Sequence, residues 1–219
     1  MHLHNVVVFD FDETLVIENS SRVLEKVMFA RYAGRFRPAI GWIFFGGGRR
    51  CANALSLIVG SLTRRRIDWR LIAFLRIMNR STSDQLTAMC EVAAAELTPN
   101  MEAIGYLSRE SQIIVASCGL APVIDAFFSK FEMDALVLRA SEVTVTTSGR
   151  IRINLIEPRD KSGVLQVIPA LHFVTDDRTE AQIVREDRER IRRASVEVFE
   201  RNGLYHVVDH NCGEGDSPS

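Results

Sequence analysis

The chain has 219 residues, of which 47% are hydrophobic, so it can bury one sizeable core and carry a smaller appended domain. Its formal net charge of −1 gives no general reason to expect a nucleic-acid partner. The four cysteines form no CxxC pair and a strand-like run starts almost at the first residue, so we expect a cytoplasmic protein without a zinc knuckle or a secretory leader.

Short apolar runs alternate with helical patterns along most of the chain. The runs are nearly continuous in β-branched and other apolar residues, as in strands that helices cover on both faces, and they lie at 4–9, 112–116, 135–138, 171–174 and 204–208. Helical patterns lie at 101–109, 122–131, 161–168 and, as a longer charged helix, about 179–202. This alternation predicts an α/β fold with a doubly wound parallel sheet.

Two insertions and a tail interrupt this order. Alternating residues around Ser148-Gly149 predict a β-hairpin over 143–155. Residues 20–97 contain no convincing strand and read as an all-helical module, so we divide the chain into a core of 1–19 and 98–219 and a helical cap of 20–97. Residues 209–219 read as a disordered end, and His206, His210 and Cys212 fit a strand and a loose tail better than a metal site.

The predicted cap is strongly basic. It holds 13 Lys and Arg against 5 Asp and Glu, which leaves 14 against 23 for the remainder. Two explanations stay open: an arginine-rich solvated surface, or a surface that attracts an anionic substrate or membrane. The segment 35–50 places a short apolar stretch with Trp42 between basic flanks; it is shorter than the roughly 20 residues that span a bilayer, but it suits the membrane interface.

Two carboxylates directly follow the first predicted strand, in Asp10-Phe11-Asp12-Glu13-Thr14. Ligands bind at the carboxyl ends of parallel strands, and residues i and i+2 face roughly the same way, so Asp10 and Asp12 can share one site. One carboxylate can attack phosphorus beside a magnesium ion while the other moves a proton. Alone, this pattern also fits a capped turn.

Three further signals follow in order. Ser117-Cys118-Gly119 precedes a helix and can cradle a phosphate at exposed N–H groups, although Ser117 also suits a helix N-cap. Lys161, one of only three lysines, can balance a carboxylate and a phosphoryl group. Acidic residues that end the strand 171–174 can complete a magnesium shell or cap a helix, namely Asp176, Asp177 and Glu180.

This ordered set resembles the haloacid-dehalogenase-like (HAD) superfamily, and the module after the first motif resembles the C1 cap of its phosphoserine-phosphatase-like branch. The resemblance implies an aspartyl-phosphate nucleophile at Asp10 and a general acid and base at Asp12. It places Thr14, Ser117, Cys118, Gly119 and Lys161 around the phosphate. It also implies Mg²⁺ bound by Asp10, Asp12, Asp176 and Asp177, with Glu180 in support.

The resemblance has departures that keep the substrate open. Thr175-Asp176-Asp177 stands where this branch usually has Gly-Asp-Gly, and Glu18 and Asn19 lie only near the position of the branch's substrate-binding Glu. Asp12 favours phosphoryl transfer, because dehalogenases of the superfamily lack the second aspartate.

We therefore expect a phosphoric monoester hydrolase acting on a phosphorylated small molecule, with no nucleic-acid partner. One alternative is a lipid phosphatase, similar to phosphatidylglycerophosphate phosphatases, in peripheral contact with anionic lipid at the inner membrane face. The other is a non-catalytic phosphate-binding or scaffolding module. An oligomer is compatible with each.

Overall fold

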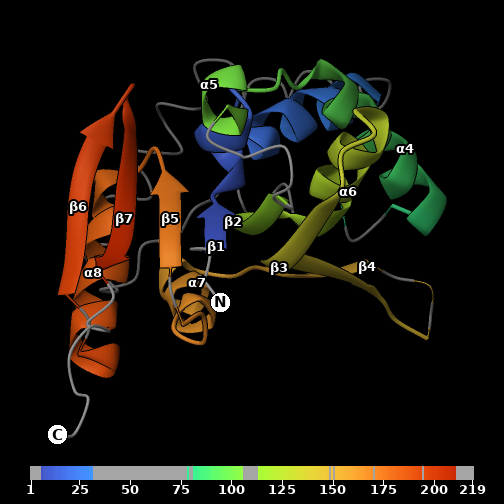
Figure 1. Ribbon diagram of the computed structural model, residues 1–219. Helices are drawn as coiled ribbons and strands as arrows, with labels where there is room; N and C mark the ends of the chain where they lie inside the picture. The colour runs from blue at the N-terminus through green and yellow to red at the C-terminus, as the bar shows by residue number, and fades with distance from the viewer. Residues whose placement is uncertain are drawn as a thin grey trace, which may run out of the picture.

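The chain folds around a seven-stranded sheet of order β4-β3-β2-β1-β5-β7-β6, as the computed structural model in Figure 1 shows. The structure describes residues 6–31, 78, 81–105, 113–147, 149, 151–169, 171–193 and 195–210. The central strand β1 (Val6–Phe9) lies between β2 (Ile113–Leu120) and β5 (Leu171–Thr175), parallel to both. The carboxyl ends of β1, β2 and β5 therefore meet at one edge of the sheet.

The sheet is mixed, whereas the sequence predicted a parallel one. β3 (Ala135–Val145) continues the parallel set beside β2. The strands at the two margins run antiparallel to their neighbours: β4 (Ile151–Asn154) pairs with β3, and β7 (Leu204–His210) pairs with β5 and with β6 (Ser195–Arg201). The α/β class is confirmed, with a parallel centre and antiparallel margins.

Helices cover both faces of the sheet, as predicted for a doubly wound fold (Figure 1). On one face α6 (Ala121–Lys130) packs on β2 and β3 and against α4 (Ser83–Glu96), and α5 (Met101–Ile104) lies near the end of β1. On the other face lie α7 (Pro158–Leu165) and α8 (Arg178–Arg192). Neighbouring residues on β1 serve the two faces, because Val8 joins the cluster under α7 and α8, and Phe9 joins the other.

The predicted hairpin insertion exists, but its first arm is not separate from the preceding strand. Residues 135–138 and 143–145 belong to one long strand, β3, whose far end pairs with β4. The turn between the two strands includes Gly149 at φ +75°, where an L side chain would be strained. Thus β3 spans the central sheet and the inserted hairpin.

The end of the predicted long helix is a strand. Helix α8 stops at Arg192, and β6 then pairs along its length with β7 through a two-residue turn at Asn202-Gly203. Both turn residues have positive φ, 53° and 76°, which is the geometry of a type I′ hairpin turn and the reason for Asn-Gly there. The charges of 195–201 had masked the alternation of Val196 and Val198. The strand β7 also extends through residue 210, so it takes in the first two residues of the predicted tail.

The predicted cap is described only at its two ends, residues 20–31 and parts of 78–97, and both ends are helical. The segments that enter and leave it lie side by side. Val16 bridges to Pro99, the Ile17 N–H donates to the Thr98 carbonyl at 3.0 Å, and the Asn100 N–H donates to the Leu15 carbonyl at 2.8 Å. The basic segment 35–50 lies outside the described residues. Among those described, no helix is long and apolar enough to cross a membrane.

Candidate active site

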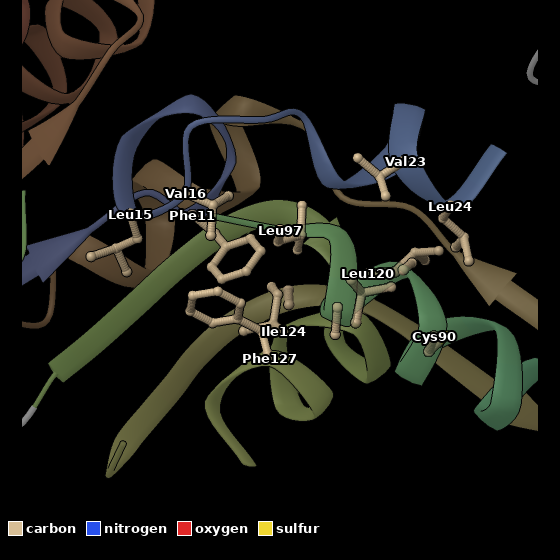
Figure 2. Close-up of a cluster of buried hydrophobic side chains, with 14 of the residues drawn as sticks. Phe11, Leu15, Val16, Val23, Leu24, Cys90, Leu97, Leu120, Ile124 and Phe127 are labelled. Atoms are coloured by element: carbon tan, nitrogen blue, oxygen red, sulfur yellow. The ribbon is translucent and has the colours of Figure 1, made fainter. Parts of the chain in front are cut away.

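The first motif forms a wide turn, η1 (Phe11–Leu15), directly after the central strand, and its backbone is not helical at Asp12 and Glu13. Phe11 is fully buried and meets Phe127 of α6 edge to face, with ring centroids 5.3 Å apart (Figure 2). The Asp10 N–H donates to the Val174 carbonyl at 2.9 Å, which continues the sheet to the first carboxylate. The apolar residue between the two aspartates therefore anchors the turn that presents both.

Asp10 lies next to the buried ammonium of Lys161. Lys161 Nζ is 3.0 Å from Asp10 Oδ1 and 2.5 Å from Glu180 Oε1, and the Lys161 side chain is 1% exposed. The Phe11 N–H also donates to Asp10 Oδ1, at 2.7 Å. Both donors contact Oδ1, so Oδ2 is the Asp10 oxygen available to react with a ligand.

The charges around Lys161 keep it protonated. Burial alone would lower the pKa of Lys161, but the carboxylates of Asp10 and Glu180 outweigh burial and raise it. Burial and the charge of Asp10 raise the pKa of Glu180, against the opposing effects of Lys161 and of a hydrogen bond from Thr175 Oγ1 at 2.8 Å. One cation thus lies between two carboxylates and can balance added negative charge at Asp10.

Asp12 is held by the start of the helix at 20–31. The Ser20 N–H donates to Asp12 Oδ1 at 2.7 Å. Burial raises the pKa of Asp12 to about 6, although both the hydroxyl and the N–H of Ser20 lower it. A carboxyl group that titrates near neutral pH suits a role as general acid and then general base.

A small hollow at Gly119 joins this carboxylate to the second motif. A Cβ added to Gly119 would lie 3.3 Å from Ser117 Oγ, 3.3 Å from Ser20 Oγ and 3.4 Å from Asp12 Oδ2. Such contacts are tighter than most real Cβ contacts, so the missing side chain leaves space between three polar atoms. The hydroxyl of Ser117 accepts a hydrogen bond from the Gly119 N–H at 3.0 Å, which fixes the local turn.

Motif two is tied to the hairpin by Ser141. The buried Ser141 hydroxyl donates to the Cys118 carbonyl at 2.7 Å and accepts from the Ile156 N–H at 3.2 Å, just before the helix that carries Lys161. The thiol of Cys118 is half-buried, and burial raises its pKa to about 11. Cys118 therefore contributes backbone to the site and is not a reactive thiolate.

The fourth motif meets the first through Thr14. The Asp176 N–H donates to Thr14 Oγ1 at 2.9 Å, and the Thr14 hydroxyl donates to Asp176 Oδ1 at 3.2 Å. Burial raises the pKa of Asp176, and the charges of Asp10 and Glu13 raise it further. Thr14, predicted to contact phosphate, is fully buried, and its hydroxyl orients Asp176.

The pair Asp10 and Asp176 fits a hard divalent cation in its donor chemistry. Mg²⁺ takes oxygen ligands, commonly binds one or two carboxylates and keeps several waters, and a cation would relieve the repulsion that raises the pKa of Asp176. No group of three or more His, Cys, Asp or Glu side chains within the described ranges is arranged as a metal site. The carboxylate pair therefore leaves the remaining positions to backbone oxygen, water or substrate.

Two residues near the motifs are engaged elsewhere. Asp177, predicted as a metal ligand, caps α8: its Oδ1 accepts from the N–H groups of Thr179 and Glu180 at 2.7 and 3.3 Å. Glu18 accepts two hydrogen bonds from Thr98, at 2.8 Å from the N–H and 2.9 Å from the hydroxyl. Glu18 thus joins the segments that enter and leave the predicted cap.

The structure brings together all four predicted motifs and adds three residues that sequence reasoning missed: Ser20, Ser141 and Thr175. Thr175 was recognised only as a departure from the usual glycine, yet its hydroxyl orients Glu180. Ser20 lies eight positions after Asp12 at a helix start, and the pattern Asn19-Ser20 was a usable signal of that start. The contact of Ser141 with the Cys118 carbonyl depends on tertiary packing, and no local sequence pattern predicts it.

No protein-family model matches this chain, and no curated protein matches it in sequence. Its structure is similar to a HAD family hydrolase from Salmonella enterica subsp. enterica serovar Typhi, at 15% identity and a TM-score of 0.43, over 74% of this chain and half of that chain. It is similar to a substrate-bound phosphoserine phosphatase at 15% identity and a TM-score of 0.46, over 77% of this chain and 71% of the other. A phosphoserine phosphatase with a phospho-aspartyl intermediate analogue gives 19% identity and a TM-score of 0.43, over 75% and 70%.

The strand order explains why the four motifs lie together. The nucleophile candidate ends the central strand, the serine motif ends one neighbouring strand, and the acidic motif ends the other. Lys161 reaches this edge from α7. The fold of this chain is an α/β fold in which the four motifs lie at one edge of the sheet.

Proposed function

We propose that this protein is a Mg²⁺-dependent phosphatase that hydrolyses a phosphate monoester through an aspartyl-phosphate at Asp10. One observation carries the proposal: Asp10 is held through Oδ1 by Lys161 and the Phe11 N–H, with the raised-pKa carboxyl of Asp12 two residues away. A nucleophile, a cation and an acid that can also act as a base are the groups that phosphoryl transfer requires.

The chain's own residues would divide the reaction into two steps. In the first, Asp10 Oδ2 bonds to phosphorus, the bond from phosphorus to the leaving-group oxygen breaks, and Asp12 gives its proton to that oxygen. In the second, Asp12 takes a proton from water as the water oxygen bonds to phosphorus, and phosphate leaves with Asp10 restored. Lys161 balances the charge at Asp10 in both steps, and Ser117 would donate to a phosphoryl oxygen.

A bound Mg²⁺ would neutralise charge on the phosphoryl oxygens. Asp10 and Asp176 are the carboxylates that would hold it, together with the backbone carbonyl of Asp12, while Asp177 remains the cap of α8. Glu180 would support the site indirectly, through its contact with Lys161. We propose a small phosphorylated metabolite as the substrate class; the lipid-phosphate alternative depends on residues 35–50.

The test is hydrolysis of p-nitrophenyl phosphate with Mg²⁺ and after chelation, for the unaltered protein and for Asp10→Asn. We expect activity only with the metal, its loss in Asp10→Asn, and a phosphoryl adduct on Asp10 that accumulates in Asp12→Asn after acid quenching. Asp134→Asn, an exposed change of the same type, is the matched control. If the unaltered protein binds phosphate but turns over no ester in a panel of sugar, amino-acid, nucleotide and lipid phosphates, the non-catalytic module replaces this proposal.

A further inference from the structure

Ser20 occupies a position that neither the predicted motifs nor the proposed mechanism uses. It is 1% exposed and is the first residue of the helix at 20–31. That helix does not need the Ser20 side chain as a cap, because Asn19 Oδ1 accepts from the Arg22 N–H at 3.2 Å and the Asn19 carbonyl accepts from Val23. A buried hydroxyl at this position therefore calls for another explanation.

The two donors of Ser20 both face Asp12. The backbone N–H contacts Asp12 Oδ1 at 2.7 Å. The hydroxyl makes no hydrogen bond of good geometry to any residue in the described part of the chain, and it borders the Gly119 hollow together with Asp12 Oδ2 and Ser117 Oγ.

This arrangement makes the two oxygens of Asp12 unequal. Oδ1 is fixed by the helix start, whereas Oδ2 faces the hollow beside Ser117, where the phosphate motif lies. A proton on Oδ2 points toward the reacting group, and a proton on Oδ1 would compete with the Ser20 N–H. We propose that Ser20 is a positioning residue that fixes Asp12 so that Oδ2 is the oxygen that exchanges the proton; this inference rests on the proposed function.

Two substitutions separate the donors. Ser20→Ala removes the hydroxyl and keeps the N–H. Ser20→Pro removes both, and proline is well accepted at the first position of a helix after an extended residue such as a cap. Ser21→Ala, the same change one residue later and half-exposed, is the matched control, and Ser20→Thr retains a hydroxyl.

The readout is the ratio of kcat/KM for an alkyl phosphate to kcat/KM for p-nitrophenyl phosphate. An alkoxide needs its proton at the transition state far more than nitrophenolate does, so a misplaced acid harms the alkyl ester selectively. We expect the ratio to fall about tenfold in Ser20→Ala and about a hundredfold in Ser20→Pro, within the range that general acids contribute, and to be unchanged in Ser21→Ala and largely restored in Ser20→Thr. Partial unfolding cannot imitate this result, because it lowers both rates equally.

Three outcomes overturn the inference. An unchanged ratio in Ser20→Pro, or an equal loss on both esters, shows that Ser20 does not act through proton transfer, while the proposed function survives. A complete lack of Mg²⁺-dependent hydrolysis by the unaltered protein overturns the proposed function and this inference together. The unaltered protein therefore distinguishes the two failures.

Discussion

Glu180 Oε1 lies 2.5 Å from the ammonium of Lys161, and the same ammonium lies 3.0 Å from Asp10 Oδ1. The second oxygen of Glu180 accepts from Thr175, so the carboxylate is fixed at both ends. Lys161 consequently shares its charge between a fixed carboxylate and the proposed nucleophile. This sharing limits how strongly the ammonium can suppress the nucleophilicity of Asp10.

We predict that Glu180→Gln lowers kcat by about 10- to 100-fold, the usual range for residues that orient catalytic groups. Without the second carboxylate, Lys161 binds Asp10 more tightly and makes it a poorer nucleophile. Steady-state kinetics on p-nitrophenyl phosphate measure this effect. Glu186→Gln, an exposed change on the same helix, is the control and should leave kcat unchanged; an equal kcat for Glu180→Gln would contradict the prediction.

Arg188 should be a main determinant of stability. It is fully buried, forms an ion pair with Asp209 of β7 and donates to the carbonyls of Leu165 and Ile168 at 2.9 and 2.8 Å. Arg188→Met leaves Asp209 without its charged partner and removes the guanidinium donor from these carbonyls, so we expect a loss of about 3 kcal/mol or more in the free energy of unfolding. Urea unfolding measures it, and Arg185→Met, which removes only an exposed pair with Glu189, should cost less than about 0.5 kcal/mol.

The free energy of unfolding should depend on pH through His206. Burial lowers the pKa of His206 to about 4, with further lowering by His172 and Arg201. His206 Nδ1 lies 2.9 Å from His172 Nε2. A folded-state pKa below the ordinary value near 6.5 means that the neutral ring favours folding. This contribution is complete above about pH 6.5 and is lost as the pH falls toward 4.

We therefore expect His206→Phe, which can still stack on Phe199, to lose less stability than the unaltered protein on acidification. The difference between pH 7 and pH 5 should be on the order of 1–2 kcal/mol. Urea midpoints measured at half-unit steps of pH test this. Parallel curves for the two proteins would show that His206 does not titrate with folding.

Gly203 and Gly163 allow a matched test of backbone conformation. Gly203 has φ +76°, while Gly163 lies inside α7, and a Cβ at either position meets no atom within 4 Å. An added methyl group has equal room at both positions, so only the backbone conformation distinguishes the two substitutions. Gly203→Ala should cost about 1–2 kcal/mol, and Gly163→Ala should be neutral or stabilise by up to about 1 kcal/mol. Thermal unfolding of both variants tests this, and a neutral Gly203→Ala would argue against the type I′ turn.

Local patterns were sufficient to predict the central strands and the four motifs, because parallel strands such as β1 and β5 are continuous apolar runs and each motif follows a strand end or starts a helix. Charge-rich segments were predicted less well. Residues 195–201 read as helix because their Glu and Arg side chains continue the composition of α8, although Asn202-Gly203 is a strong hairpin signal. In that same helix, the buried Arg188 looks like the exposed arginines around it.

At the site, residue types predicted the chemistry, but packing decided the partners. Asp177 and Thr14 have side chains that can bind a metal or a phosphate. In the structure, however, Asp177 caps the start of α8 and Thr14 forms hydrogen bonds with Asp176. Ser20 and Ser141 are distant in sequence from the groups that they contact, so only the folded chain shows their relation.

The segments that enter and leave the predicted cap are held together by the contacts Val16–Pro99, Ile17–Thr98 and Glu18–Thr98. Changes of length within the predicted cap that leave the helix at 20–31 and α4 intact can therefore be absorbed without shifting the central sheet, as at other sites where the ends of an inserted segment lie together. Asp12 is the exception, because its hydrogen-bond donor belongs to the inserted side of that junction. A cap of altered length or sequence would consequently change substrate range and proton transfer together, so recombining caps among related proteins should retain the first helical turn with its Ser20.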